Sequence, residues 1–94
     1  LDLRLYALRR LGDKDDEKTT DQLIAMYDGE QNPQVRMVLL RGFGNSKQKS
    51  AVRKLMVIAK NDPSVEMRKL AVRYLGDSKD PEALKFLEDL LQVK

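Results

Sequence analysis

The sequence contains no cysteine, no histidine and no tryptophan, and its only aromatic side chains are three tyrosines and two phenylalanines. The lack of cysteine excludes disulfides and thiol chemistry. The lack of histidine excludes imidazole acid–base catalysis, Ser-His-Asp triads and His-ligated zinc sites. Five glycines and three prolines are too few for an all-β protein, which needs a turn every few residues. Because no run of 18 apolar residues occurs, we expect no membrane-spanning helix and no membrane partner.

Charged residues are abundant. They make up 35% of the 94 residues and hydrophobic residues 41%, which is typical of one charge-rich helical domain, residues 1–94, rather than of a disordered segment. The net charge of +3 is unevenly distributed. Residues 1–32 carry 5 basic and 8 acidic side chains, residues 33–64 carry 7 basic and one acidic, and residues 65–94 carry 6 of each. The positive charge therefore belongs to the centre of the chain.

A repeat of 32 residues divides the chain into the same three parts. Gly12, Gly44 and Gly76 are 32 residues apart, and the segments that end near them align: LDLRLYALRRLGD, PQVRMVLLRGFGN and VEMRKLAVRYLGD. Apolar residues share four columns, namely Leu3/Val35/Met67, Ala7/Leu39/Ala71, Leu8/Leu40/Val72 and Leu11/Phe43/Leu75. Their spacing of i, i+4, i+5 and i+8 is one face of an α-helix.

A second helix is predicted after each glycine of the column. Its apolar columns are Leu23/Leu55/Leu87, Met26/Ile58/Leu90 and Tyr27/Ala59/Leu91, again at helical spacing. The prediction is therefore six helices, no strand, and short loops near Gly12, Gly29, Gly44, Asn61 and Gly76. The core of the middle repeat is predicted to consist of Leu39, Leu40, Phe43, Val52, Leu55 and Ala59.

Capping residues indicate where these helices start and stop. Asn32-Pro33, Asp62-Pro63 and Asp80-Pro81 each place a capping side chain before a proline at the first helical position. Thr19-Thr20-Asp21-Gln22 has the spacing of a capping box. Gly29 and Gly44 are predicted to end helices in the left-handed conformation.

The stretch Arg41-Gly42-Phe43-Gly44 also matches the first four positions of the RNP1 pattern of RNA-recognition domains. The next four residues match none of that pattern. Gly42 aligns with Arg10 and Tyr74, so its position has no glycine requirement shared between the repeats. We therefore interpret this stretch as a helix C-terminus.

Helix pairs of about 30 residues with D/N-P-x-V-R near the start resemble HEAT repeats, most closely the short HEAT-like repeats first noted in phycocyanobilin lyases. Asn32-Pro33-Gln34-Val35-Arg36 is the best local copy. The resemblance implies an all-α fold, an α-solenoid of three helical hairpins covering approximately residues 1–32, 33–64 and 65–94. In such a right-handed stack the second helices line the concave side and the first helices the convex side. One hairpin cannot cover its own apolar face, so hairpins must stack.

A basic strip on the second helix of the middle repeat is the predicted partner-binding site. Its residues, with one from the third repeat, are Lys49, Arg53, Lys54, Val57, Lys60 and Lys85. Arg53 and Lys54 are predicted to be solvent-exposed and to attract an acidic or mixed-charge protein or peptide. The alternative for the strip is a helix face whose long basic side chains are merely solvated.

The function predicted from these patterns is a non-catalytic protein-interaction scaffold without cofactor or metal. One alternative is binding of a nucleic-acid backbone through the central basic repeat, and another is an accessory fragment of a bilin-lyase-like enzyme. Arg4, Arg36 and Arg68 share a column beside the apolar face, and we expect them to form a structural ladder to nearby carboxylates or carbonyls. The patterns identify neither the partner nor the compartment.

Apolar residues near both termini lead to a further expectation. Leu1, Leu3, Leu5 and Tyr6 near the start, and Phe86 and Val93 near the end, extend beyond the main core stripe. We expect the chain to belong to a longer array or a larger protein, or to associate with itself through these terminal repeats.

Overall fold

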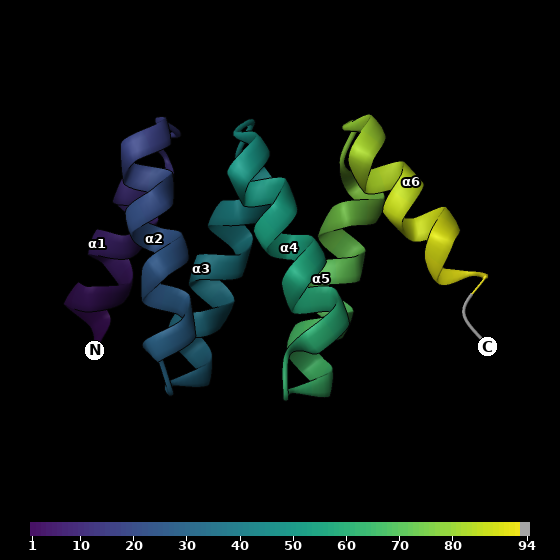
Figure 1. Ribbon diagram of the computed structural model, residues 1–94. Coiled ribbons are helices and arrows are strands. Elements are labelled where there is room, and N and C mark those ends of the chain that lie inside the picture. The colour runs from purple at the N-terminus through teal and green to yellow at the C-terminus, as the bar shows by residue number, and fades with distance from the viewer. Residues whose placement is uncertain (93–94) are drawn as a thin grey trace.

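A computed structural model describes residues 1–92 and shows six α-helices connected in three hairpins (Figure 1). The helices are α1 (Asp2–Gly12), α2 (Glu17–Gly29), α3 (Pro33–Asn45), α4 (Lys49–Asn61), α5 (Val65–Asp77) and α6 (Pro81–Leu90). No strand occurs within the described residues. The predicted all-α solenoid and its helix positions are confirmed. Val93, one of the predicted terminal apolar residues, lies outside the described part.

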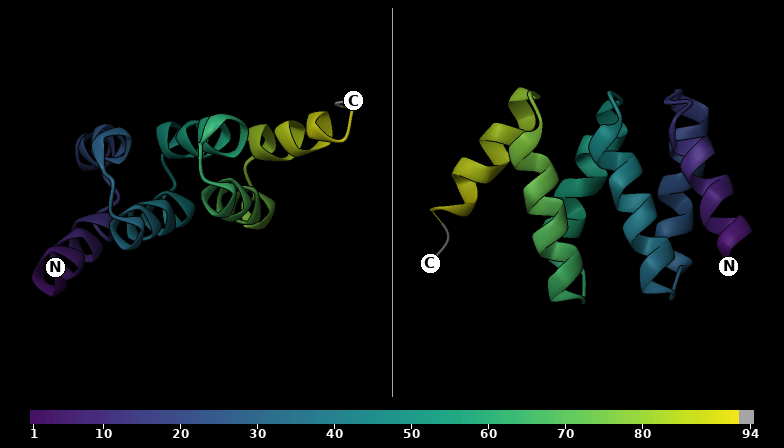
Figure 2. Two further views of the ribbon diagram at one scale, coloured as in Figure 1. Left: turned by 90° about the horizontal axis from the view of Figure 1, so that it is seen from below. Right: turned by 180° about the vertical axis from the view of Figure 1, so that it is seen from behind.

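The helices form two layers, which the left view of Figure 2 shows from below. One layer consists of α1, α3 and α5, and the other of α2, α4 and α6. Within each layer every helix packs against the next, α1 on α3 and α3 on α5, α2 on α4 and α4 on α6. The result is an elongated stack with extents of 42 × 25 × 18 Å. We call the outer surface of α2, α4 and α6 the second-helix face.

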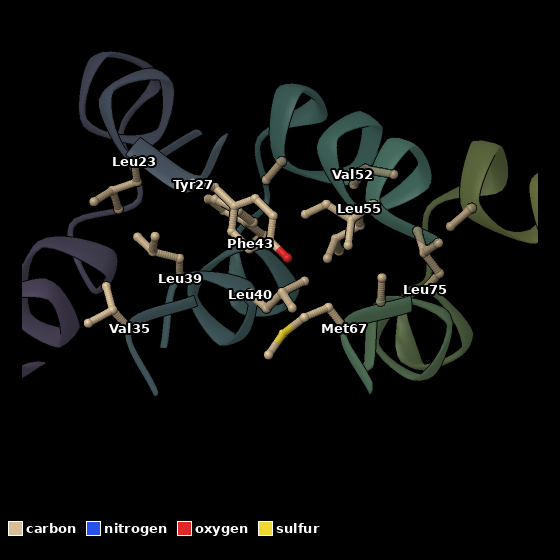
Figure 3. Packing of buried hydrophobic residues seen from close by; sticks show 14 of the residues in the cluster. Leu23, Tyr27, Val35, Leu39, Leu40, Phe43, Val52, Leu55, Met67 and Leu75 are labelled. Carbon is tan, nitrogen blue, oxygen red and sulfur yellow. The ribbon is translucent and has the colours of Figure 1, made fainter. Parts of the chain in front are cut away.

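One continuous core runs between the two layers and through all three repeats (Figure 3). Leu39, Leu40, Phe43, Val52 and Leu55, which were predicted for the middle repeat, are all buried. Ala59 is half-buried and packs against this core. The ring of Tyr27 from the first repeat meets Phe43 edge to face at 6.2 Å between centroids. The core of the middle repeat is therefore continuous with the cores of both neighbouring repeats.

Two of the predicted helix starts are wrong, and both differences have a physical cause. The cap of α2 is Asp16, which accepts a hydrogen bond from the Thr19 amide at 2.7 Å, so the helix begins before the predicted capping box. The cap of α5 is Ser64 and not Asp62. Asp62 instead follows the end of α4, where its carboxylate is held by the Ser64 amide and by side chains of other helices. The caps Asn32 and Asp80 are as predicted.

The predicted left-handed glycines are also wrong, because no glycine among residues 1–92 has a positive φ. Gly44 lies inside α3, and a Cβ built on it would stand 2.5 Å from Cδ1 of Tyr74. Glycine is therefore needed at position 44 because α3 packs closely against Tyr74 of α5, and not because of its backbone conformation. The non-glycine residue with a positive φ is Asp15, at 47°, in the loop between α1 and α2.

Candidate functional site

A groove of about 720 Å³ lies between α2 and α4 on the second-helix face. One wall carries the carboxylates of Glu17 and Asp21 from α2. The opposite wall carries cationic side chains from α4 and from the loop before it, namely Lys47, Lys49, Arg53 and Lys54. Ile24 and Val57 contribute apolar surface, and Val57 is 53% exposed. We call this hollow the α2/α4 groove.

Two cations of α4, Lys49 and Arg53, are already paired with carboxylates at the start of α6. Lys49 Nζ lies 2.7 Å from Asp80 Oδ2, and Arg53 donates two hydrogen bonds to Glu82 at 3.0 and 3.2 Å. These bonds raise the pKa of both Lys49 and Arg53 and lower the pKa of Glu82. Two of the four cations of this wall are therefore oriented toward the third repeat and share their charge with its carboxylates. Arg53 stays exposed, as predicted, with 62% of its side chain accessible.

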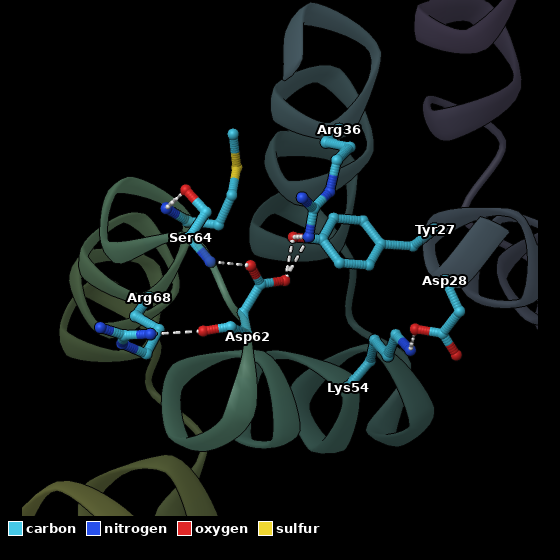
Figure 4. A network of polar contacts seen from close by, with 8 residues as sticks. Tyr27, Asp28, Arg36, Lys54, Asp62, Ser64 and Arg68 are labelled. Carbon is cyan, nitrogen blue, oxygen red and sulfur yellow. Dashed lines mark hydrogen bonds and ion pairs between the residues drawn. The ribbon is translucent and has the colours of Figure 1, made fainter. Parts of the chain in front are cut away.

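Lys54 differs from the prediction, because only 10% of its side chain is exposed. Its ammonium lies 2.7 Å from Oδ1 of Asp28 and 5.6 Å from the ring centroid of Tyr27, both on α2 (Figure 4). The stem of Lys54 covers the contact between the first two repeats. The residue packs the two repeats together at the edge of the groove.

The structure brings together only part of the predicted strip. Lys49, Arg53, Lys54 and Val57 line the α2/α4 groove, whereas Lys60 and Lys85 lie outside its lining. Lys85 pairs with Asp89 on its own helix at 3.0 Å. Lys60 is exposed and has no ion pair within residues 1–92.

A polar network joins the repeats at the end of the groove (Figure 4). The buried hydroxyl of Tyr27 donates to Oδ2 of Asp62 at 2.7 Å, and Arg36 donates to the Tyr27 oxygen at 2.9 Å. Arg36 also forms an ion pair with Asp62, and its guanidinium stacks 4.7 Å from the Tyr27 ring centroid. Burial and the neighbouring Asp62 carboxylate raise the pKa of Tyr27 far above its usual value. The hydroxyl therefore stays a donor.

The contacts of Arg4, Arg36 and Arg68 confirm the predicted arginine ladder. Arg4 pairs with Glu30 as Arg36 pairs with Asp62, in each case between the first helix of a repeat and the end of its second helix. Arg68 donates to the backbone carbonyl of Asp62. All three arginines of the column therefore have structural roles.

The architecture of stacked helical hairpins agrees with a comparison against known families. The family model of HEAT repeats matches residues 20–94. The chain belongs to the HEAT repeat family. No curated protein and no solved structure proved significantly similar to this HEAT-repeat chain.

Two further properties of this HEAT-repeat chain concern residues 1–92 alone. Within that part, no three carboxylates gather in a way that could hold a metal ion. None of its helices is long and apolar enough to cross a membrane.

The prediction missed the acidic wall of the groove. Glu17 and Asp21 share columns with Lys49 and Arg53, so the HEAT register places acids on α2 at the same positions where α4 carries bases. That alternation was visible in the aligned repeats. The acidic wall follows from the sequence only when α2 and α4 are taken as neighbours, because these two helices form opposite walls of one groove.

Proposed function

We propose that this HEAT-repeat chain is a non-catalytic scaffold that binds a protein segment of mixed charge in the α2/α4 groove. HEAT repeats are commonly protein-interaction scaffolds. The observation that carries the proposal is the groove itself, in which walls of opposite charge flank an exposed apolar residue, Val57. A segment with acidic side chains toward α4, basic side chains toward α2 and an apolar side chain over Val57 complements all three features.

The ion pairs to α6 favour a mixed-charge partner over a purely acidic one. Lys49 and Arg53 each share their charge with a carboxylate of the third repeat, so a partner meets a weakened positive field. The two hydrogen bonds to Glu82 restrict the orientation of the Arg53 guanidinium, and its remaining amino nitrogen has no hydrogen-bond partner within residues 1–92. A donor held in place before binding loses less side-chain entropy when the partner arrives.

Binding of a nucleic-acid backbone is less well supported at this site. The central repeat is strongly basic, but Glu17 and Asp21 face the same groove and repel phosphate. Binding of a single-stranded oligothymidylate, measured over a range of salt concentrations, tests the nucleic-acid function. Phosphate contacts would make the logarithm of the binding constant fall steeply with the logarithm of the salt concentration.

Peptide display against the immobilised chain tests the proposal. Selected peptides should carry both acidic and basic residues around an apolar one, and amide chemical shifts should move at Glu17, Asp21 and Val57. Val57→Glu should weaken the binding of these peptides at least tenfold. Met37→Glu is the matched control, because Met37 is similarly exposed but lies on α3 in the other layer.

Two results would contradict the proposal. One is a set of peptides whose chemical-shift changes fall on α1, α3 and α5. The other is equal loss of binding in the Val57 and Met37 variants, which would indicate a general effect of added charge.

A further inference from the structure

The second-helix face contains two junctions, one between α2 and α4 and one between α4 and α6 (Figure 1). At the second junction Lys49 pairs with Asp80 at 2.7 Å and Arg53 pairs with Glu82 at 3.0 Å. The residues at the equivalent positions of the first junction, in the 32-residue register, are Glu17, Gln48, Asp21 and Ser50. Two carboxylates of α2 thus stand opposite two neutral side chains, and within the described part of the chain neither bridge has a counterpart at the first junction.

The α2/α4 groove opens where these bridges are missing, because all four of these residues line it. Glu17 and Asp21 are exposed and form no ion pair within residues 1–92. The hydroxyl oxygen of Ser50 is buried and takes part in no hydrogen bond within the same residues. Farther along the groove, Lys54 bridges the same two helices through Asp28. This part of the groove therefore offers unpaired acceptors to a ligand.

Ion pairs leave the groove with an excess of unpaired negative charge. Three of its four cations, Lys49, Arg53 and Lys54, pair with carboxylates that lie outside the groove lining. The fourth, Lys47, has no ion pair within residues 1–92 and stands against the two carboxylates of α2. The unpaired charges are therefore two negative and one positive, and they attract a cation more strongly than an anion.

We propose that an arginine side chain of the partner segment lies between Asp21 and Ser50 and takes the place that the bridge from Arg53 to Glu82 has at the second junction. This inference rests on the proposed function and names the residue of the mixed-charge segment that decides specificity. A guanidinium presents a planar fork of N–H donors, which suits the carboxylates of α2 together with the Ser50 hydroxyl oxygen. Lysine supplies the same charge from a single nitrogen and fits this set of acceptors less well.

Three substitutions in the chain test the role of Asp21. Asp21→Asn removes the charge and keeps the size, whereas Asp21→Arg places a repelling cation at this exposed position. Ser50→Arg supplies the missing cation from α4 itself, in register with the bridge between Arg53 and Glu82 but with the charges exchanged. Its guanidinium should pair with Asp21 and occupy the site. Asp77→Asn is the matched control, since Asp77 is an exposed carboxylate on α5 in the other layer.

Titration of the chain with Nα-acetyl-arginine amide, followed by amide chemical shifts at constant ionic strength, tests the site without a peptide. We expect saturable shifts at Asp21 and Ser50. Nα-acetyl-citrulline amide, which has a similar shape and no charge, should give none at equal concentration. Asp21→Asn should weaken the binding of the arginine probe about two- to fivefold, as for the loss of one solvent-exposed ion pair. Asp21→Arg and Ser50→Arg should abolish it, and Asp77→Asn should leave it unchanged.

A second titration uses the mixed-charge peptides selected on the chain, with citrulline in place of their arginine. The exchange should weaken their binding to the wild-type chain. It should have no further effect on the Asp21→Asn variant, because the charge that the arginine meets is already absent.

The arginine site and the scaffold function fail in different ways. Peptides that move the Val57 amide and bind equally well with citrulline would overturn the arginine site and leave the scaffold function standing. Equal affinity of the arginine probe for the wild type and Asp21→Asn would do the same. An arginine probe that binds at Asp21, although no peptide binds in the groove, would support the site and overturn the scaffold function instead.

Discussion

The glycines of this chain have different neighbours. Replacing them with alanine therefore distinguishes the effect of side-chain packing on stability from the effect of backbone entropy. A Cβ on Gly44 collides with the ring of Tyr74, whereas a Cβ on Gly29 meets nothing within 4 Å. Both glycines are helical, so alanine fits the backbone at either position. We expect Gly29→Ala to stabilise the fold by about 0.5–1 kcal/mol, through lower entropy of the unfolded chain.

Gly44→Ala should do the opposite and destabilise the fold by roughly 1–3 kcal/mol, because the Tyr74 ring must leave its place between α3 and α5. Urea unfolding of the two variants measures both effects. A Gly44→Ala variant as stable as Gly29→Ala would show that the contact between these two helices is not tight.

Asp62 gives the stability a dependence on pH. Burial raises the pKa of the Asp62 carboxyl. Hydrogen bonds from the Ser64 amide and the Tyr27 hydroxyl, together with the charge of Arg36, lower this pKa by a larger amount, so that the net shift is downward. A carboxyl whose pKa is lower in the folded than in the unfolded state stabilises the fold above the unfolded pKa, which is about 4. That contribution is lost as the pH falls through the folded pKa.

Asp62→Asn should therefore cost roughly 1–3 kcal/mol of unfolding free energy at pH 7, since Tyr27 and Arg36 lose a charged partner. Below pH 3 the cost should shrink. Urea unfolding at both pH values tests this, with Asp77→Asn, an exposed carboxylate in the same register as Asn45, as control. An equal cost at both pH values would remove Asp62 as the origin of the pH dependence.

At the scale of elements, α4 is the helix on which the stack depends most. Ala51, Val52, Leu55 and Ile58 of α4 are buried, and it packs against α2, α3, α5 and α6. Leu55→Ala should cost roughly 2–5 kcal/mol, as for other buried leucines. Val57→Ala on the exposed side of the same helix should cost less than 0.5 kcal/mol. Thermal and urea unfolding distinguish the two, and a small effect at Leu55 would mean that the faces of α4 are assigned wrongly.

The helices and the core could be predicted because both follow from positions within a repeat. The columns of Leu39, Leu40 and Leu55 are apolar in every repeat, and a helix must bury such a face. The side-chain partners of the groove could not be predicted in this way. Lys54 is covered because Tyr27 of the preceding repeat lies beside it, and Arg53 is paired because Glu82 belongs to the following one. Such contacts depend on the lateral offset of neighbouring repeats.

The start of α5 illustrates the same limit at a cap. Asp62-Pro63 has the composition of a helix start, as Asn32-Pro33 does. The Asn32 side chain is free to bond the first amides of α3. The Asp62 carboxylate is shared with Tyr27 and Arg36, and the helix begins only after Ser64. Tertiary contacts thus decided between two local capping choices.

At the scale of the whole molecule, the distribution of buried residues predicts unequal local stability. The central helices α3 and α4 each bury four residues, whereas Leu8 is the buried residue of α1 and Ala83 that of α6. In a linear stack each repeat is stabilised by its neighbours, and a terminal repeat has only one. Opening of α1 and α6 should therefore need less free energy than opening of the centre.

Amide hydrogen exchange measures this gradient directly. At low protein concentration we expect exchange to be slowest in α3 and α4 and fastest in α1 and α6. Equal protection in all six helices at low concentration would instead show that the three repeats unfold as one unit, with the ends held as firmly as the centre.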